Sequence, residues 1–157
     1  MNDPLFQIVP FNEKLAPHFE ALNREWIERY FAIEEADRVL FADPFSAIVK
    51  PGGLIFFVIA GEEVVGTCAV VRHNARVFEL AKMAVSPNAQ GRGYGNQLMK
   101  AAIEFARNAG ADTLVLLTNS NLGPALQLYE NHGFKRVAVS ISDEYVRADV
   151  QMELSLR

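Results

Sequence analysis

The stretch VFELAKMAVSPNAQGRGYGN, residues 77–96, decides the fold. It opens with the apolar alternation of a strand at the centre of a sheet, and it ends with glycines at positions 91, 93 and 95 before a helical pattern begins. Glycines leave backbone N–H groups unshielded by a Cβ atom, and the first N–H groups of a helix have no acceptor within it. The stretch therefore predicts a strand, an anion-binding loop and a helix in direct succession.

Several interpretations of this glycine loop compete. A purely structural turn requires only that glycines lead into a helix. The dinucleotide fingerprint G-x-G-x-x-G has a different spacing and opens a βαβ unit, whereas this strand follows an antiparallel hairpin. A P-loop requires a lysine followed by serine or threonine, which this loop lacks. A loop that holds a pyrophosphate on backbone amides is the functional interpretation that remains beside the structural turn.

The residue pattern on both sides of this stretch predicts a mixed α/β fold. The expected strands span residues 5–10, 54–60, 64–73, 76–86, 113–118, 134–142 and 146–155. The expected helices span residues 14–31, 34–41, 93–109 and 124–131. This order describes a mixed sheet with helices on both faces. Because no repeat or linker composition interrupts it, we expect a single domain over residues 1–157.

Composition excludes several classes of protein. The chain of 157 residues is 50% hydrophobic and 22% charged, which suits one globular domain of ~100–200 residues. A net charge of −4 argues against a nucleic-acid binder. The apolar runs are shorter than the ~20 residues of a membrane-spanning helix. No export signal is visible and Cys68 is the single cysteine, so we expect a cytoplasmic location and a buried, unreactive Cys68.

The pattern Gln90-x-x-Gly93-x-Gly95 is preceded by ELAKMAVSP and followed by NLGPALQLYENHGF at residues 121–134. This combination resembles the GNAT superfamily of acyl-CoA-dependent N-acyltransferases, over roughly residues 54–137 and in the element order of the whole chain. The resemblance implies a mostly antiparallel seven-stranded sheet. In that sheet a bulge splays one parallel strand pair, and acetyl-CoA binds in the gap.

The resemblance also implies which residues bind coenzyme A. The amides of residues 91–96 would cradle its pyrophosphate, and those of Met83 and Val85 would hold its pantetheine arm. The spacing leaves open which of Asn119 and Asn121 contacts the cofactor. The full expected set is Met83, Ala84, Val85, Gln90, Gly91, Arg92, Gly93, Tyr94, Gly95, Asn96, Asn119, Asn121 and Tyr129. No metal site is expected.

Glu79, Met83 and Tyr129 are the expected catalytic residues. Alternation places Glu79 on one face with Ala81, Met83 and Val85. The resemblance implies that Glu79 is a general base, because an alkylammonium of pKa ~10.4 must lose a proton before it attacks. A ligand for the substrate ammonium and a structural ion pair are the other two interpretations. The Met83 amide would polarise the thioester carbonyl, an interaction that contributes ~2.7–4 kcal/mol.

For Tyr129 the resemblance implies support of thiolate departure. Transfer of a proton from a tyrosine of pKa ~10 to a thiolate of ~8.5 is uphill by roughly 2 kcal/mol, so hydrogen-bond donation is the expected role. The alternative is a ring that only packs between helix and sheet. His132 is expected to be structural, and His73, near a strand end, is a second candidate titrating group.

We therefore expect an N-acetyltransferase that moves an acetyl group from acetyl-CoA to a primary amine by direct attack in a ternary complex. A non-catalytic acyl-CoA-binding or sensing module and a transferase of longer acyl groups are the alternatives. The expected partner is a small-molecule or peptide amine, with no nucleic acid and no membrane, and a homodimer is one option. Six acidic residues favour cationic acceptors, with a solvated acidic face as the alternative; they are Glu34, Glu35, Asp37, Asp43, Asp143 and Glu144.

Overall fold

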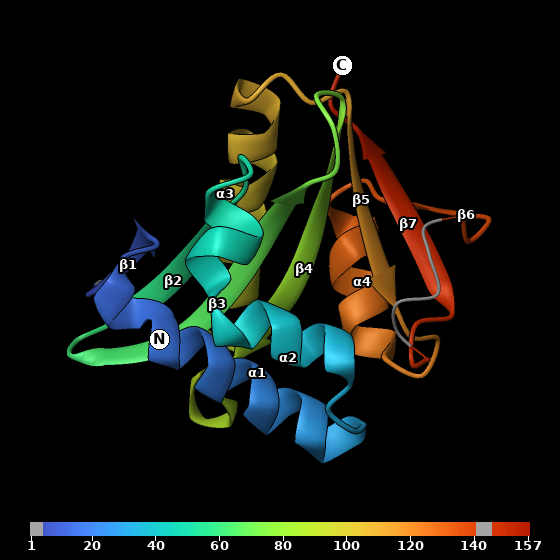
Figure 1. The fold of residues 1–157 in the computed structure, drawn as a ribbon. Coiled ribbons are helices and arrows are strands. Elements are labelled where there is room, and N and C mark those ends of the chain that lie inside the picture. The colour runs from blue at the N-terminus through green and yellow to red at the C-terminus, as the bar shows by residue number, and fades with distance from the viewer. Residues whose placement is uncertain (1–4, 141–145) are drawn as a thin grey trace.

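The computed structural model describes residues 5–140 and 146–157 as a twisted seven-stranded sheet between two layers of helices (Figure 1). The strands are β1 Phe6–Pro10, β2 Leu54–Ala60, β3 Glu63–Arg72, β4 Val77–Val85, β5 Thr113–Thr118, β6 Lys135–Val137 and β7 Val150–Ser155. They lie in the order β1-β2-β3-β4-β5-β7-β6, and every neighbouring pair is antiparallel except the parallel pair β4–β5. The predicted mixed, mostly antiparallel sheet is confirmed.

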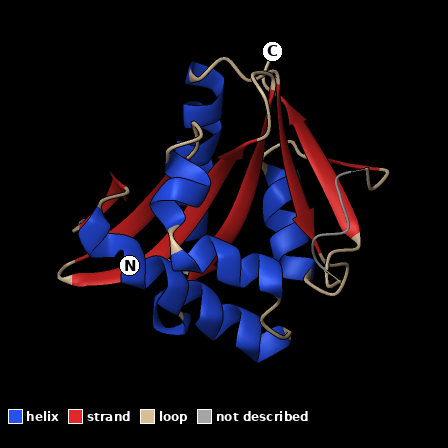
Figure 2. Cartoon of the chain, viewed as in Figure 1, coloured by secondary structure: helices blue, strands red, loops and turns tan. Residues whose placement is uncertain are grey.

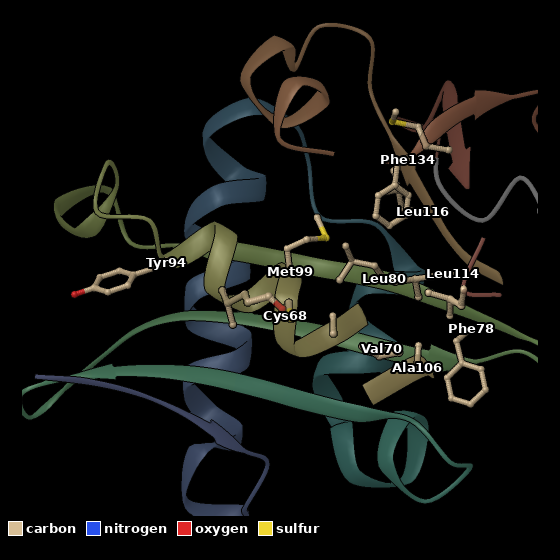
Figure 3. Packing of buried hydrophobic residues seen from close by; sticks show 14 of the residues in the cluster. Cys68, Val70, Phe78, Leu80, Tyr94, Met99, Ala106, Leu114, Leu116 and Phe134 are labelled. Carbon is tan, nitrogen blue, oxygen red and sulfur yellow. Dashed lines mark hydrogen bonds between the residues drawn. The ribbon is translucent and has the colours of Figure 1, made fainter. Parts of the chain in front are cut away.

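The helices cover both faces of the sheet, as the sequence predicted (Figure 2). They are α1 Ala16–Tyr30, α2 Glu35–Ala42, α3 Tyr94–Asn108 and α4 Gly123–Asn131, with short helical turns η1 Glu13–Leu15, η2 Phe45–Val49 and η3 Pro87–Ala89. One hydrophobic cluster joins α1, α2 and η2 to β2 and β3. A second joins α3 and α4 to the opposite face (Figure 3). Each helix therefore buries one apolar stripe against the sheet.

The last two strands are shorter than predicted. β6 covers only Lys135–Val137, because Ser140 N–H donates to the Gln151 side chain at 2.8 Å rather than continuing the backbone ladder. β7 begins at Val150, because the residues before it bond to other segments: Val146 N–H donates to the Glu34 side chain, and the Asp149 carboxylate accepts from Ser120. Residues 141 and 142, the end of the strand predicted at 134–142, lie outside the described residues. Tertiary hydrogen bonds therefore override the strand pattern here.

Candidate active site

Strands β4 and β5 separate along their C-terminal halves. Their register runs from Val77 opposite Thr113 to Leu80 opposite Leu116 and extends no further. Figure 1 shows the two strands together at one end and diverging toward the other. Against β3 on its other side, β4 uses two residues, Lys82 and Met83, where β3 uses one. This is a β-bulge, which increases local twist and turns the strand away from its neighbour. The splayed parallel pair predicted from the sequence is present.

The bulge corrects one prediction about side-chain direction. Alternation placed Glu79, Ala81, Met83 and Val85 on one face, but the extra residue reverses the alternation after Ala81. Met83 and Val85 pack against the cluster beneath α3, whereas Lys82 reaches Asp37 of α2 on the opposite side. Lys82 has φ 54, a left-handed conformation that is rare for a side-chain-bearing residue. The prediction that Glu79 and Met83 share a face is therefore wrong.

The opening between the strands continues into a cleft of about 780 Å³, part of it open to solvent. The three expected catalytic residues, Glu79, Met83 and Tyr129, all line this cleft. Its other walls come from α1, from β5 and from the segment before β7. The fold therefore brings together residues that the chain holds far apart.

The glycine loop lies between η3 and α3. Gly91 and Gly93 have φ 81 and φ 84, and a Cβ atom at either position would meet no atom within 4 Å. The space in front of the loop is thus open, while the amides that begin α3 have no intrahelical acceptors. The Gln90 side chain donates to the Val85 carbonyl at 3.2 Å and ties the loop back to β4. The loop and the start of α3 thus have the arrangement of an anion-binding helix N-terminus.

The side chains that follow the glycines are engaged elsewhere. Tyr94 is buried, with its ring centroid 5.4 Å from that of Phe6. Asn96 Oδ1 lies 2.9 Å from His132 Nε2, which joins the first turn of α3 to the end of α4. Their backbone amides, rather than their side chains, are therefore the groups placed for a ligand. His132 has the structural contact that the sequence predicted.

Asn119 and Asn121 occupy different positions. Asn119 lines the cleft, but its side chain donates to the Arg147 carbonyl at 2.6 Å and accepts from Asn121 N–H at 2.8 Å. Asn121 is exposed and is not among the residues that line the cleft. Asn119 therefore holds the loop between β5 and α4 against the segment before β7.

Glu79 is paired with a residue that sequence analysis treated separately. Its Oε1 lies 2.6 Å from His73 Nε2, and the Glu79 side chain is 12% exposed against 36% for His73. The hairpin between β3 and β4 turns on two bonds from residues 73 and 74 to the Val77 carbonyl. The hairpin register thus places the His73 imidazole beside the Glu79 carboxylate. The period-two pattern of both strands could have predicted this pair from the sequence.

Tyr129 is half-buried between α4 and the sheet, with its ring centroid 6.2 Å from that of Phe134. Burial raises the pKa of Tyr129 to about 12. Complete transfer of its proton to a thiolate of pKa ~8.5 would then be uphill by about 5 kcal/mol. The phenol is therefore suited to donating a hydrogen bond.

A buried charge cluster forms the wall beside Glu79. Asp37 is completely buried, and its Oδ1 accepts from Lys82 Nζ and from Arg147 Nη2, each at 2.6 Å. Its Oδ2 accepts from Arg147 Nη1 and from the Glu34 amide, each at 2.8 Å. Burial raises the pKa of Asp37, but hydrogen bonds from Arg147 and Lys82 outweigh it and lower the pKa to about 2. Burial also lowers the pKa of Lys82, against the effect of Asp37.

This cluster was not predicted, because it depends on contacts between α2, β4 and the segment before β7. The acidic residues at 34–37 were expected to favour a cationic acceptor or to form a solvated face. Neither expectation holds for Asp37, which is neutralised inside the protein. Glu34 also pairs with Arg147, at 3.3 Å. Of the other expected acidic residues, 143 and 144 lie outside the described residues.

Comparison with known families decides which of the expected activities applies. The model described as "Acetyltransferase (GNAT) family" matches residues 15–134. The chain belongs to the GNAT acetyltransferase family. This confirms the predicted superfamily and the predicted enzyme class, an N-acetyltransferase of the acyl-CoA-dependent type.

Three curated relatives share about a third of their aligned residues with this GNAT chain. The "Uncharacterized N-acetyltransferase YvbK" of Bacillus subtilis is 33% identical over 106 residues, which is 66% of this chain and 68% of that protein. Mycothiol acetyltransferase of Pseudarthrobacter chlorophenolicus is 34% identical over 55% of this chain, but this covers only 28% of that protein. N-acetylaspartate synthetase of Danio rerio is 34% identical over 61% of this chain and 35% of that protein.

Solved structures share the fold at lower identity. A GNAT acetyltransferase from Staphylococcus aureus Mu50 superposes with a TM-score of 0.88 at 18% identity, covering 97% of this chain and 99% of that one. YncA from Salmonella typhimurium, solved with acetyl-CoA, gives 0.78 at 16% identity, covering 98% and 95%. These likenesses support the fold alone.

Within residues 5–140 and 146–157, no three His, Cys, Asp or Glu side chains are grouped to hold a metal ion. In the same ranges, no helix has the length and apolarity needed to cross a membrane.

Proposed function

We propose that this GNAT enzyme acetylates a primary amine by direct attack, with the opened β4–β5 pair as its reaction centre. The observation that carries the proposal is that Glu79, Met83 and Tyr129 line one cleft beside that opening. A carboxylate, a backbone amide and a phenol are the groups that transfer from a thioester to an amine uses. Acetyl-CoA supplies the activated acetyl group.

The cofactor is held mainly by backbone. The amides of residues 91–96 bind the pyrophosphate, and those of Met83, Ala84 and Val85 bind the pantetheine arm. Two observations support this. The register of β4 with β5 ends at Leu80 opposite Leu116, and a Cβ atom at Gly91 or Gly93 would meet no atom within 4 Å. Asn119, which lines the cleft, is the better placed of the two asparagines.

Glu79 acts as the base. Its carboxylate accepts a proton from the acceptor ammonium, whose ordinary pKa of ~10.4 leaves little free amine at neutral pH. His73 orients this carboxylate through the contact at 2.6 Å. His73 is thus a positioning residue of the same base.

Met83 and Tyr129 stabilise charge that develops during transfer. The Met83 amide donates to the carbonyl oxygen of the acetyl group. The Tyr129 hydroxyl donates to the departing sulfur and keeps its own proton, because burial raises its pKa to about 12.

The cytoplasmic location, the single domain over residues 1–157 and the homodimer stay predictions.

Thiol release from acetyl-CoA tests the proposal. Amino acids, polyamines, aminoglycosides, arylalkylamines and lysine peptides serve as acceptors, with propionyl-CoA and butyryl-CoA as competing donors. We expect acetyl-CoA to raise the melting temperature and one acceptor class to be acetylated. Stabilisation by acetyl-CoA without turnover on any amine would favour a sensing module. Faster transfer of a longer acyl group would contradict acetyl specificity.

A further inference from the structure

The charged side chains that line the cleft are of both signs. Among the described residues they are Glu79, Lys82 and Arg147, whose side chains are only 12%, 6% and 13% exposed. Two cations and one carboxylate, each largely shielded from solvent, thus line the cleft. Trp26 and Phe31 supply apolar surface in the same cleft.

Asp37 lies behind the two cations rather than in the cleft. It is completely buried and is not among the cleft-lining residues, yet it contacts both Lys82 and Arg147. Arg147 is held in two-pronged geometry, with Nη1 and Nη2 on the two oxygens of Asp37. Asp37 therefore holds both cations in place without itself lining the cleft, and Glu34 adds a second carboxylate contact to Arg147 at 3.3 Å.

This arrangement lowers the cost of binding an anion. Lys82 and Arg147 are already desolvated and oriented, so a ligand carboxylate would meet cations that need little reorganisation. Glu79 offers the opposite charge in the same cleft. A small molecule that carries both an ammonium and a carboxylate can pair its ammonium with Glu79 and its carboxylate with the two cations.

We propose, building on the function proposed above, that the acceptor is an amino acid whose amine lies at Glu79 and whose carboxylate lies at Lys82 and Arg147. The carboxylate fixes the amine for attack and excludes amines that lack it. Asp37 is a positioning residue for this subsite.

Matched pairs of acceptors test the proposal on the wild-type enzyme. L-Phenylalanine is compared with L-phenylalaninamide and phenethylamine, and L-methionine with L-methioninamide. We expect kcat/KM to be at least tenfold higher for each acid. Amidation lowers the pKa of the neighbouring amine and so increases its reactive fraction, which biases the comparison against this result. 3-Phenylpropionate, which lacks the amine, should inhibit competitively with respect to the amino acid.

A charge-removing variant sharpens the result. Lys82→Gln should lower the acid-to-amide ratio of kcat/KM at least fivefold, and Lys82→Arg should retain most of it. Lys50→Gln, at an exposed lysine outside the cleft, is the matched control and should keep the wild-type ratio. If Lys82→Gln does not fold, the wild-type comparison decides alone.

The outcomes separate this inference from the function on which it rests. Turnover of amides or simple amines at rates equal to or above those of the acids would overturn the amino-acid proposal and leave the transferase intact. No turnover of any amine would overturn both.

Discussion

The cofactor side and the acceptor side of the cleft are built in different ways. The proposed cofactor side is one continuous segment, from the bulge at Lys82 to the start of α3, and the groups proposed to bind there are mainly backbone amides. The proposed acceptor side is made of side chains from distant parts of the chain. Asp37 contacts Lys82, 45 positions away, and Arg147, 110 positions away. Local sequence therefore determines the first side, and tertiary packing determines the second.

Removing the buried anion should have the largest effect. Asp37→Asn leaves two buried cations without their shared carboxylate, which is expected to cost about 3–5 kcal/mol in the free energy of unfolding. Urea denaturation at pH 7 measures the loss. The matched control is Asp112→Asn, whose partner Arg157 is 70% exposed and whose removal should change stability little.

The same residue predicts an acid dependence. The folded pKa of Asp37, about 2, lies below its ordinary value of 3.8. Its stabilisation is therefore complete above the ordinary value and is lost as the pH falls through the folded value. Thermal melts from pH 7 to pH 2 should show this component in the wild type and not in Asp37→Asn. Parallel curves for the two proteins would argue that Asp37 is not ionised in the fold.

A smaller effect is expected on the cofactor side. Gly93→Val forces a β-branched residue to φ 84, a strain of about 1–2 kcal/mol. The free loop relieves this strain by leaving that conformation, and acetyl-CoA must restore it, so binding should weaken about tenfold. Isothermal titration measures the affinity. Gly61→Val at φ 65 imposes similar strain in the β2–β3 turn, with nothing within 4 Å of the new Cβ. Equal weakening in both variants would show that the loop has no special role.

This contrast explains what the sequence could predict. The open loop at Gly91 and Gly93 could be predicted from the sequence, because a glycine with positive φ before a helix is a local feature. The face of Met83 was mispredicted, because the bulge depends on pairing with β3. Arg147 was missed, because its partners Glu34 and Asp37 lie on another helix and its cap. The seven strands and four helices of the described residues followed from periodicity, whereas the ends of β6 and β7 depend on side-chain hydrogen bonds.

Tyr129→Phe should have a more modest effect. Loss of one hydrogen bond to a developing charge is expected to lower kcat about tenfold, without a change in acetyl-CoA affinity. Steady-state kinetics with the preferred acceptor measures it. Tyr30→Phe, at a tyrosine that does not line the cleft, is the control. A wild-type kcat in Tyr129→Phe would leave only the packing role.

The smallest effect is expected at Cys68. The thiol is completely buried beneath α3, and burial raises its pKa, so it is neither exposed nor nucleophilic (Figure 3). Cys68→Ala should retain kcat within twofold. Ellman's reagent should modify the native protein only after unfolding. A large loss of turnover in a folded Cys68→Ala would indicate a covalent route instead of direct transfer.

Glu79 connects the two sides, since it lines the cleft and lies on the strand that leads to the glycine loop. The most direct test of the account measures kcat and acetyl-CoA affinity in Glu79→Gln, with Glu63→Gln as an exposed control on β3. We expect kcat to fall about a hundredfold, with affinity for acetyl-CoA unchanged and the control like wild type. Turnover of Glu79→Gln within threefold of the wild type would contradict the assignment of Glu79 as the base.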